Sequence, residues 1–235
     1  DTFRRPVTQV DNLPAEIADQ QVIELPFPAN ESVVDELLYA YDNSYRQPGT
    51  TTFVLDTSGS MEGQRIASLK DIMHSLIDGS ASTLTGDVSL RDRENVTLQS
   101  FDSRPNDPVT ARFSHEDSAA AAELTKYVDG LSASGSTAMY QTLLEALRGT
   151  DPAGGIPSIV LLSDGQDTVG PRFSKFKEEY EQLPAAQRSV PVFVILYGDA
   201  SESEMRELAE LTGGEVFDAL SGDLAAAFKE IRGFQ

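Results

Sequence analysis

Between residue 51 and the end of the chain, short apolar segments alternate with segments that have helical periodicity. Such alternation is typical of βαβ units, which build a mainly parallel sheet with helices on both faces. The predicted strands cover residues 51–56, 95–101, 109–113, 157–163, 191–197 and 215–218. The predicted helices cover residues 63–79, 115–130, 138–148, 172–183, 202–211 and 221–232. Because strand 109–113 follows the turn sequence of residues 101–105, we expect it to be the one antiparallel edge of a doubly wound α/β fold.

Residues 1–50 have a different pattern. The first part is interrupted by Pro6, Pro14 and Pro26 and shows no sustained period. A helix fits residues 32–45, where most apolar side chains fall on one face, and Pro48 follows soon after it. We therefore predict an N-terminal helical extension or linker over residues 1–50 and one α/β domain over residues 51–235. Because the first residue is Asp rather than Met, we also expect a processed or excised piece of a longer protein.

Charge and composition exclude several classes of partner. The chain has 38 acidic and 18 basic residues, and its formal net charge is −20. Such a charge repels nucleic acid phosphates and anionic membrane surfaces. No apolar run approaches the roughly 20 residues that a membrane-spanning helix needs. The absence of cysteine excludes disulfides and thiol catalysis, but it does not decide the cellular compartment.

An acid and two hydroxyls follow the first predicted strand of the sheet. Asp56, Ser58 and Ser60 come at its carboxyl end, where open α/β sheets bind their ligands. Oxygen side chains of this kind are ligands that Mg²⁺ prefers, with water completing its coordination. The same sequence also fits a simple turn in which Asp and Ser only cap the following helix. This motif alone does not decide between a metal site and a capped turn.

Two further polar loops lie at the same predicted edge. Thr137 ends the short loop 134–137, just before the helical pattern of residues 138–147. Asp164 follows the apolar strand 157–163. Since the carboxyl ends of parallel strands meet at one edge, we expect Thr137 and Asp164 to surround one point together with the first motif.

These three motifs together resemble the von Willebrand factor type A family. D-T-S-G-S at residues 56–60, the Thr of G-S-T-A at 137 and the Asp of S-D-G at 164 match the three parts of its metal-ion-dependent adhesion site. Residues 211–214 and 216–217 are similar to the late T-G-G and the short final strand of that family. The resemblance runs from about residue 50 to residue 231. It implies a metal site made of Asp56, Ser58, Ser60, Thr137 and Asp164.

The resemblance also implies a function. In such a site the hydroxyls bind the ion directly, one or both acids reach it through water, and one coordination position stays open. The expected ion is Mg²⁺, with Mn²⁺ or Ca²⁺ as possible substitutes. The expected partner is a protein that offers an acidic side chain, and no catalysis is expected. The expected location of the protein is extracellular or at the cell envelope.

The N-terminal segment has a weaker resemblance of its own. Residues 3–6, residues 25–28 and the predicted helix look like a junction found in some bacterial exported proteins. There, a domain similar to periplasmic binding proteins precedes a von Willebrand factor type A domain. The resemblance implies that residues 1–50 are the tail of an upstream domain and a connecting helix. The alternative is an extension that packs on this domain.

Two other functional classes are compatible with parts of the pattern. Aspartyl phosphatases also place an acid at a strand end beside Mg²⁺, but they need a second acid two residues later, where this chain has Ser58. A serine hydrolase would need a G-x-S-x-G turn, which is missing around Ser58. A structural domain with a vestigial metal site is the third possibility.

The remaining polar residues have simpler interpretations. Asp167 fits either a position around the metal ligands or the solvated tip of its loop, and we expect the tip. Asp102 lies at the same predicted sheet edge as the metal site, where it could approach the ion or form a turn, and we expect the turn. Arg65 is expected on the solvent face of its helix. His74 and His115 are expected to be structural.

Overall fold

The computed structural model describes residues 31–41, 45–80, 89–151, 153–165, 167–197, 202–218 and 227–231. The chain divides into two units, residues 1–45 and residues 46–235. In the first unit, helix α2 covers Glu31–Ala40 and corresponds to the predicted helix 32–45. The features expected within residues 1–30 lie outside the described residues, as do residues 42–44.

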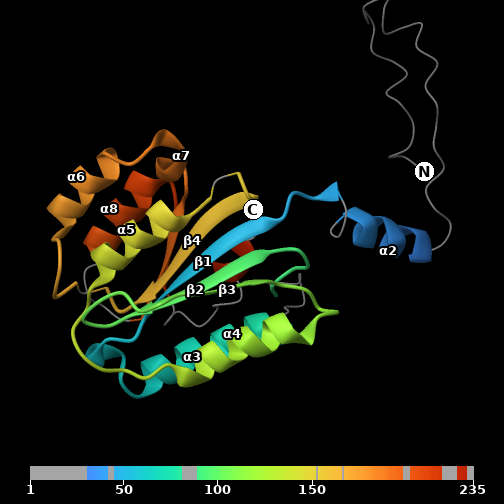
Figure 1. Cartoon of the computed structure of the whole chain (residues 1–235), viewed down its shortest axis with the longest axis horizontal. Coiled ribbons are helices and arrows are strands. Elements are labelled where there is room, and N and C mark those ends of the chain that lie inside the picture. The colour runs from blue at the N-terminus through green and yellow to red at the C-terminus, as the bar shows by residue number, and fades with distance from the viewer. Residues whose placement is uncertain are drawn as a thin grey trace, which may run out of the picture. The chain divides into compact units, whose positions relative to one another are not determined.

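The second unit contains a six-stranded sheet with the order β3-β2-β1-β4-β5-β6 (Figure 1). All neighbouring strands are parallel except β2 and β3, which confirms the predicted fold class and its one antiparallel edge. The strands are β1 (Gly49–Asp56), β2 (Asn95–Phe101), β3 (Val109–Arg112), β4 (Ile156–Ser163), β5 (Val192–Leu196) and β6 (Val216–Asp218).

Helices cover both faces of this sheet (Figure 1). One face is covered by α3 (Gln64–Asp78) and α4 (Ser118–Gly130). The other is covered by α5 (Met139–Gly149), α6 (Phe173–Glu181), α7 (Ala185–Arg188) and α8 (Glu202–Thr212). Helix α7 was not predicted, because four residues after Pro184 are too few to show a period. Of the predicted helix 221–232, residues 227–231 are described, and they are helical. Among the described helices, none has the length and apolar character needed to cross a bilayer.

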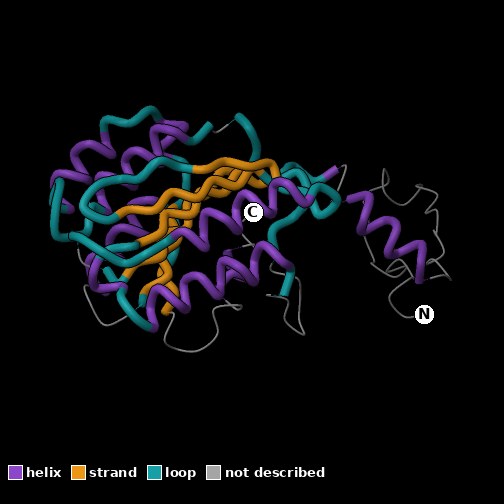
Figure 2. The backbone as a smooth tube through the Cα atoms, turned by 60° about the horizontal axis from the view of Figure 1, so that its bottom comes forward, coloured by secondary structure: helices purple, strands orange, loops and turns teal. Residues whose placement is uncertain are grey.

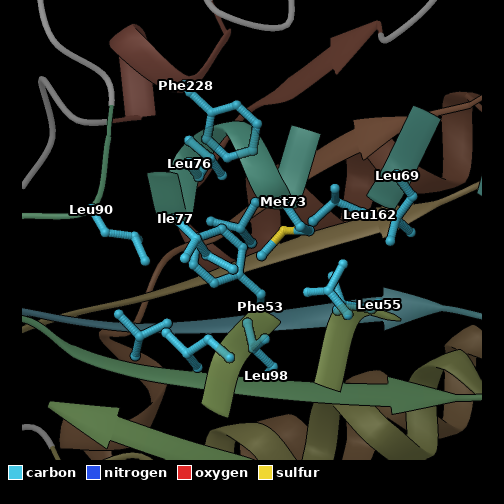
Figure 3. Close-up of a cluster of buried hydrophobic side chains, with 14 of the residues drawn as sticks. Phe53, Leu55, Leu69, Met73, Leu76, Ile77, Leu90, Leu98, Leu162 and Phe228 are labelled. Atoms are coloured by element: carbon cyan, nitrogen blue, oxygen red, sulfur yellow. The ribbon is translucent and has the colours of Figure 1, made fainter. Parts of the chain in front are cut away.

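The core lies in two layers, one on each side of the sheet. Along β1, Phe53 and Leu55 belong to the layer under α3 and α4, whereas Val54 belongs to the layer under α5, α6 and α8. Figure 3 shows Phe53 beside Met73 and Ile77, two buried residues of α3. Because the central strands are buried on both faces, their sequences are continuous apolar runs. The smoothed backbone shows the strands as one layer between helices (Figure 2).

The strand order reverses direction between β1 and β4. From β1 the chain proceeds outward to β2 and β3, and it then returns to add β4, β5 and β6 on the other side. Such a reversal leaves a crevice at the carboxyl ends of the two central strands, and this is where open α/β sheets bind ligands. The fold therefore places Asp56 at the end of β1 and Asp164 directly after β4, the two strands that flank this position.

Candidate metal centre

Asp56 is the last residue of β1 and is fully buried. Its Oδ1 accepts a hydrogen bond from the backbone N–H of Ser58 at 2.9 Å, and its Oδ2 accepts one from the hydroxyl of Ser163. Burial raises the pKa of the Asp56 carboxyl, while these hydrogen bonds act in the opposite direction. The carboxylate is therefore held in one orientation by the turn that follows β1 and by the last residue of β4.

Ser58 and Ser60 are the two hydroxyls of the same turn. Ser58 precedes the short 3₁₀ helix η2 (Gly59–Met61), and its extended backbone lets the chain turn away from the sheet. The two side-chain oxygens are 3.0 Å apart. Ser58 is buried and Ser60 is exposed, so the pair reaches from the sheet edge towards solvent. The turn thus offers two neutral oxygens next to the Asp56 carboxylate.

The loop that precedes α5 is attached to this turn by backbone hydrogen bonds. The N–H of Gly59 donates to the carbonyl of Gly135 at 3.0 Å, and the N–H of Ser134 donates to the carbonyl of Thr57 at 2.8 Å. Gly135 has a φ of +73°, and a Cβ at this position would lie 2.6 Å from the Oγ of Ser103. Only glycine fits there without strain. The buried Thr137 follows two residues later.

Asp164 follows β4, and its side chain is only 5% exposed. Its Oδ2 lies 3.1 Å from the Nη1 of Arg65, which also donates to the carbonyl of Ser60 at 2.9 Å. The Oδ1 of Asp164 is buried and has no hydrogen-bond partner among the residues that the structure describes. Arg65 was predicted on the solvent face of its helix, and this prediction was incomplete. The first turn of α3 lies beside the end of β4, so a side chain that is 44% exposed still reaches Asp164.

The prediction for Asp167 was wrong. The residue is not a solvated loop tip, because it is half-buried and its Oδ1 accepts a hydrogen bond from the N–H of Tyr140 at 3.3 Å. Burial raises the pKa of Asp167 to about 6, with the negative charge of Glu204 as a smaller cause. Tyr140 in turn donates its hydroxyl proton to Glu204 of α8. Asp167 therefore belongs to a polar group that connects the loop after β4 with α5.

The histidines belong to other parts of the molecule. The Nε2 of His74 lies 3.1 Å from Asp129 of α4. The Nδ1 of His115 lies 2.9 Å from Asp92. Neither of these pairs involves the loops that carry Asp56, Thr137 or Asp164. Within the described ranges there is also no group of three or more His, Cys, Asp or Glu side chains placed to hold a metal ion by themselves.

The donor set fits a hard cation. It contains two buried carboxylates and three hydroxyls, and one carboxylate oxygen, Oδ1 of Asp164, lacks a partner in the part of the chain that the structure describes. Hard divalent cations bind such oxygens and retain several waters when a site supplies few carboxylates. The hydrogen bonds of Gly59 with Gly135 and of Ser134 with Thr57 hold two of the loops together, and Arg65 connects the third.

Three comparisons place the chain among known proteins. A model of the von Willebrand factor type A domain matches residues 51–217. The human inter-alpha-trypsin inhibitor heavy chain H4 is 28% identical over 140 residues, which are 56% of this chain. The chain spans only 14% of the length of that relative.

Solved structures with the same fold have lower identity. The manganese-loaded TRAP protein of Plasmodium vivax superposes with a TM-score of 0.54 and 19% identity, over 79% of this chain and 73% of that one. The von Willebrand factor domain of the type V pili tip protein Mfa5 from Porphyromonas gingivalis gives a TM-score of 0.52 and 15% identity, over 82% of this chain and 98% of that one. At these identities the likeness shows the fold. The family model covers most of the sheet and its helices, and the chain therefore belongs to the von Willebrand factor type A domain family.

Proposed function

We propose that this domain binds a partner protein through a divalent cation held at the carboxyl ends of β1 and β4. The observation that carries the proposal is the burial of the Asp164 side chain together with an oxygen for which the described residues offer no partner. Its side chain is almost completely buried, and within the described part of the chain its Oδ1 has no hydrogen-bond partner. A buried carboxylate oxygen without a partner is costly, and a bound cation or its water would satisfy it.

The cation would be held by the hydroxyls of Ser58, Ser60 and Thr137, with Asp56 and Asp164 bound directly or through water. Mg²⁺ suits this donor set, and Mn²⁺ or Ca²⁺ are the alternatives. The similar solved structure of the TRAP protein is manganese-loaded. Bound in this way, the cation supplies an electrophilic position for a carboxylate. The protein's own residues orient the ligands of the cation. Both oxygens of Asp56 accept hydrogen bonds, so its carboxylate cannot rotate freely.

The partner is proposed to be a protein with an acidic side chain at its contact surface. Its acid would complete the coordination of the cation. Because one similar structure is a pilus tip protein, we propose an extracellular or cell-envelope location. An upstream domain similar to periplasmic binding proteins remains part of this proposal. It rests only on the sequence of residues 1–50.

The geometry favours binding over catalysis. In a phosphatase of the aspartyl type, Asp56 would attack phosphorus, but its two oxygens already accept hydrogen bonds from Ser58 and Ser163. Position 58 offers no general acid. For a serine hydrolase, the base is missing, since His74 and His115 pair with acids outside the site. We therefore propose that the domain is not an enzyme.

Affinity capture with and without EDTA tests the proposal. The purified domain is immobilised and exposed to the envelope fraction of its native organism, in parallel with Thr137→Ala. We expect at least one protein to be retained by the unaltered domain only when Mg²⁺ is present, and to be lost with Thr137→Ala. Identical retention with Mg²⁺ and with EDTA, together with no effect of the substitution, would show a structural domain with a vestigial site.

A further inference from the structure

Arg65 brings a positive charge to the edge of the candidate metal centre. One nitrogen of its guanidinium, Nη1, contacts both the carbonyl of Ser60 and the Oδ2 of Asp164. These two acceptors belong to different loops, one after β1 and one after β4. An exposed ion pair on a protein surface contributes little. This pair differs, because the Asp164 side chain is only 5% exposed and is shielded from bulk water.

The charged groups near the centre therefore include the guanidinium of Arg65 as well as the two proposed carboxylate ligands. Asp56 and Asp164 together balance a divalent cation, and the three hydroxyls are neutral. Arg65 adds one positive charge beyond that balance. A unit charge and a divalent cation separated by several ångströms repel each other enough to change the affinity by roughly three- to tenfold, even when water screens them well.

The site therefore has two opposing requirements. Asp164 needs a partner for Oδ2 so that the buried side chain is oriented with Oδ1 available. The partner that provides this orientation is a cation, which repels a second cation nearby. A neutral donor at position 65 would still offer a hydrogen bond, but without the repulsion.

We propose that Arg65 lowers the affinity of the centre for its divalent cation and leaves the loaded centre with a net positive charge. This inference rests on the proposed function, and it assigns a role to a residue outside the set of metal ligands. The consequence is specific to this chain. On a domain with a net charge of −20, Arg65 provides a local positive field where an acidic group of a partner would approach.

Titration of the whole chain with Mn²⁺ tests the inference, with isothermal calorimetry as the measurement. The variants are Arg65→Gln and Arg65→Met, which remove the charge, and Arg65→Lys, which retains it. Arg65→Gln, whose amide can still donate a hydrogen bond to Asp164, is expected to bind Mn²⁺ roughly three- to tenfold more tightly than the unaltered chain at low ionic strength. Arg65→Met removes both the charge and the donor, so it should bind Mn²⁺ more tightly than the unaltered chain but less tightly than Arg65→Gln. At high salt both differences from the unaltered chain should shrink, because screening weakens the repulsion. Arg65→Lys should stay within about twofold of the unaltered chain.

Arg148→Gln is the matched control. Arg148 lies on α5 and pairs with Glu179 at 2.9 Å, so the control removes the same charge from an ion pair outside the centre. It should leave Mn²⁺ affinity unchanged. Thermal melting in EDTA checks that each variant is folded. If one of the two charge-free variants does not fold, the other still tests the inference.

The outcomes separate the two proposals. If the unaltered chain binds no Mn²⁺, the proposed function fails, and this inference fails with it. If the unaltered chain binds Mn²⁺ but the charge-free variants bind equally well or more weakly, only the role of Arg65 is wrong. If the difference in Mn²⁺ affinity between the charge-free variants and the unaltered chain does not change with salt, the role of Arg65 is also wrong. Salt screens a repulsion between charges, but it does not screen a purely structural effect of Arg65.

Discussion

At the scale of single residues, the two acids of the candidate centre differ in how well their oxygens are satisfied. Asp56 has a hydrogen-bond donor at each oxygen. Asp164 has Arg65 at one oxygen, and none of the described residues donates to the other. Since a buried oxygen without a partner costs free energy, the gain from binding a cation should be concentrated at Asp164. Asp56 instead provides a fixed reference position at the end of β1.

Asp167 gives the first prediction, which concerns pH. Its pKa is raised by burial to about 6, above the ordinary value of 3.8, so the folded state binds more protons than the unfolded state between these two values. The unfolding free energy of the unaltered chain therefore decreases as pH rises through this window. Asp167→Asn cannot ionise, and its side-chain oxygen can still accept from Tyr140. It should be more stable than the unaltered chain above about pH 6, by about 1 kcal/mol after allowance for partial exposure, and no more stable near pH 4.

Urea unfolding in EDTA from about pH 4 to about pH 8 provides the measurement. Asp129→Asn serves as the control, because Asp129 is an exposed acid of α4 whose side chain is 66% accessible. If the difference between Asp167→Asn and the unaltered chain does not change with pH, the raised pKa is wrong.

At the scale of elements, the aromatic residue Tyr140 connects α5 with two neighbouring helices. The ring of Tyr140 lies 5.4 Å from that of Phe173 and 5.2 Å from that of Phe176, both on α6. Its hydroxyl donates to Glu204 on α8. Because α5 begins directly after the loop that carries Thr137, the packing of Tyr140 also positions this part of the candidate centre.

The second prediction separates these two contributions. Tyr140→Phe removes only the hydroxyl and should cost about 1 kcal/mol of unfolding free energy. Tyr140→Ala leaves a cavity beside Phe173 and Phe176 and should cost about 3–5 kcal/mol. Urea unfolding of both variants provides the measurement. Equal costs for the two variants would mean that the hydrogen bond, rather than ring packing, holds α5 in place.

Most helices and strands were predictable from the sequence, because the side chains that they bury make the pattern of apolar residues periodic or continuous. All six strands were expected, since central strands buried on both faces appear as apolar runs, and β3 was expected at the antiparallel edge. The start of β1 was placed two residues late, because Gly49 and Thr50 have no apolar side chain to extend the run. Helix α7 was missed for lack of length.

The surroundings of the candidate centre were less predictable. Periodicity places Arg65 in the first turn of a helix, but it does not show which strand end lies beside that turn. The contact of Arg65 with Asp164 joins residues 99 positions apart. The contact of Asp167 with Tyr140 likewise depends on how α5 packs beside the loop after β4. The five proposed ligands were found from their motifs, and their role remains a proposal.

At the scale of the whole molecule, the acidic surface constrains the partner. A net charge of −20 repels an acidic protein at long range, although at physiological salt this repulsion is screened beyond about 8 Å. The expected partner therefore has one acid at the contact point on an otherwise neutral or basic surface. Its association rate should rise at low salt if basic groups dominate that surface.

The third prediction concerns the two units of the chain. Residues 46–235 contain the whole sheet and both described core layers, so a truncated chain that starts at Arg46 should fold and bind metal like the full chain. Helix α2 carries exposed apolar and aromatic side chains, among them Leu37 and Tyr39, and its removal should reduce self-association. Thermal melting, Mn²⁺ titration and light scattering of both chains provide the measurements. Failure of the truncated chain to fold would show that residues 1–45 are part of the domain's core.

Calorimetric titration of the whole chain with Mg²⁺ and Mn²⁺ tests the central claim most directly. We predict reversible binding that raises the melting temperature, because a ligand at about 100 times its Kd stabilises the folded state by about 2.7 kcal/mol. Asp56→Ala, and separately Ser58→Ala combined with Ser60→Ala, should abolish both the heat of binding and the stabilisation, while Asp129→Asn should retain them. No binding by the unaltered chain at millimolar metal, or undiminished binding by Asp56→Ala, would contradict the metal centre described above.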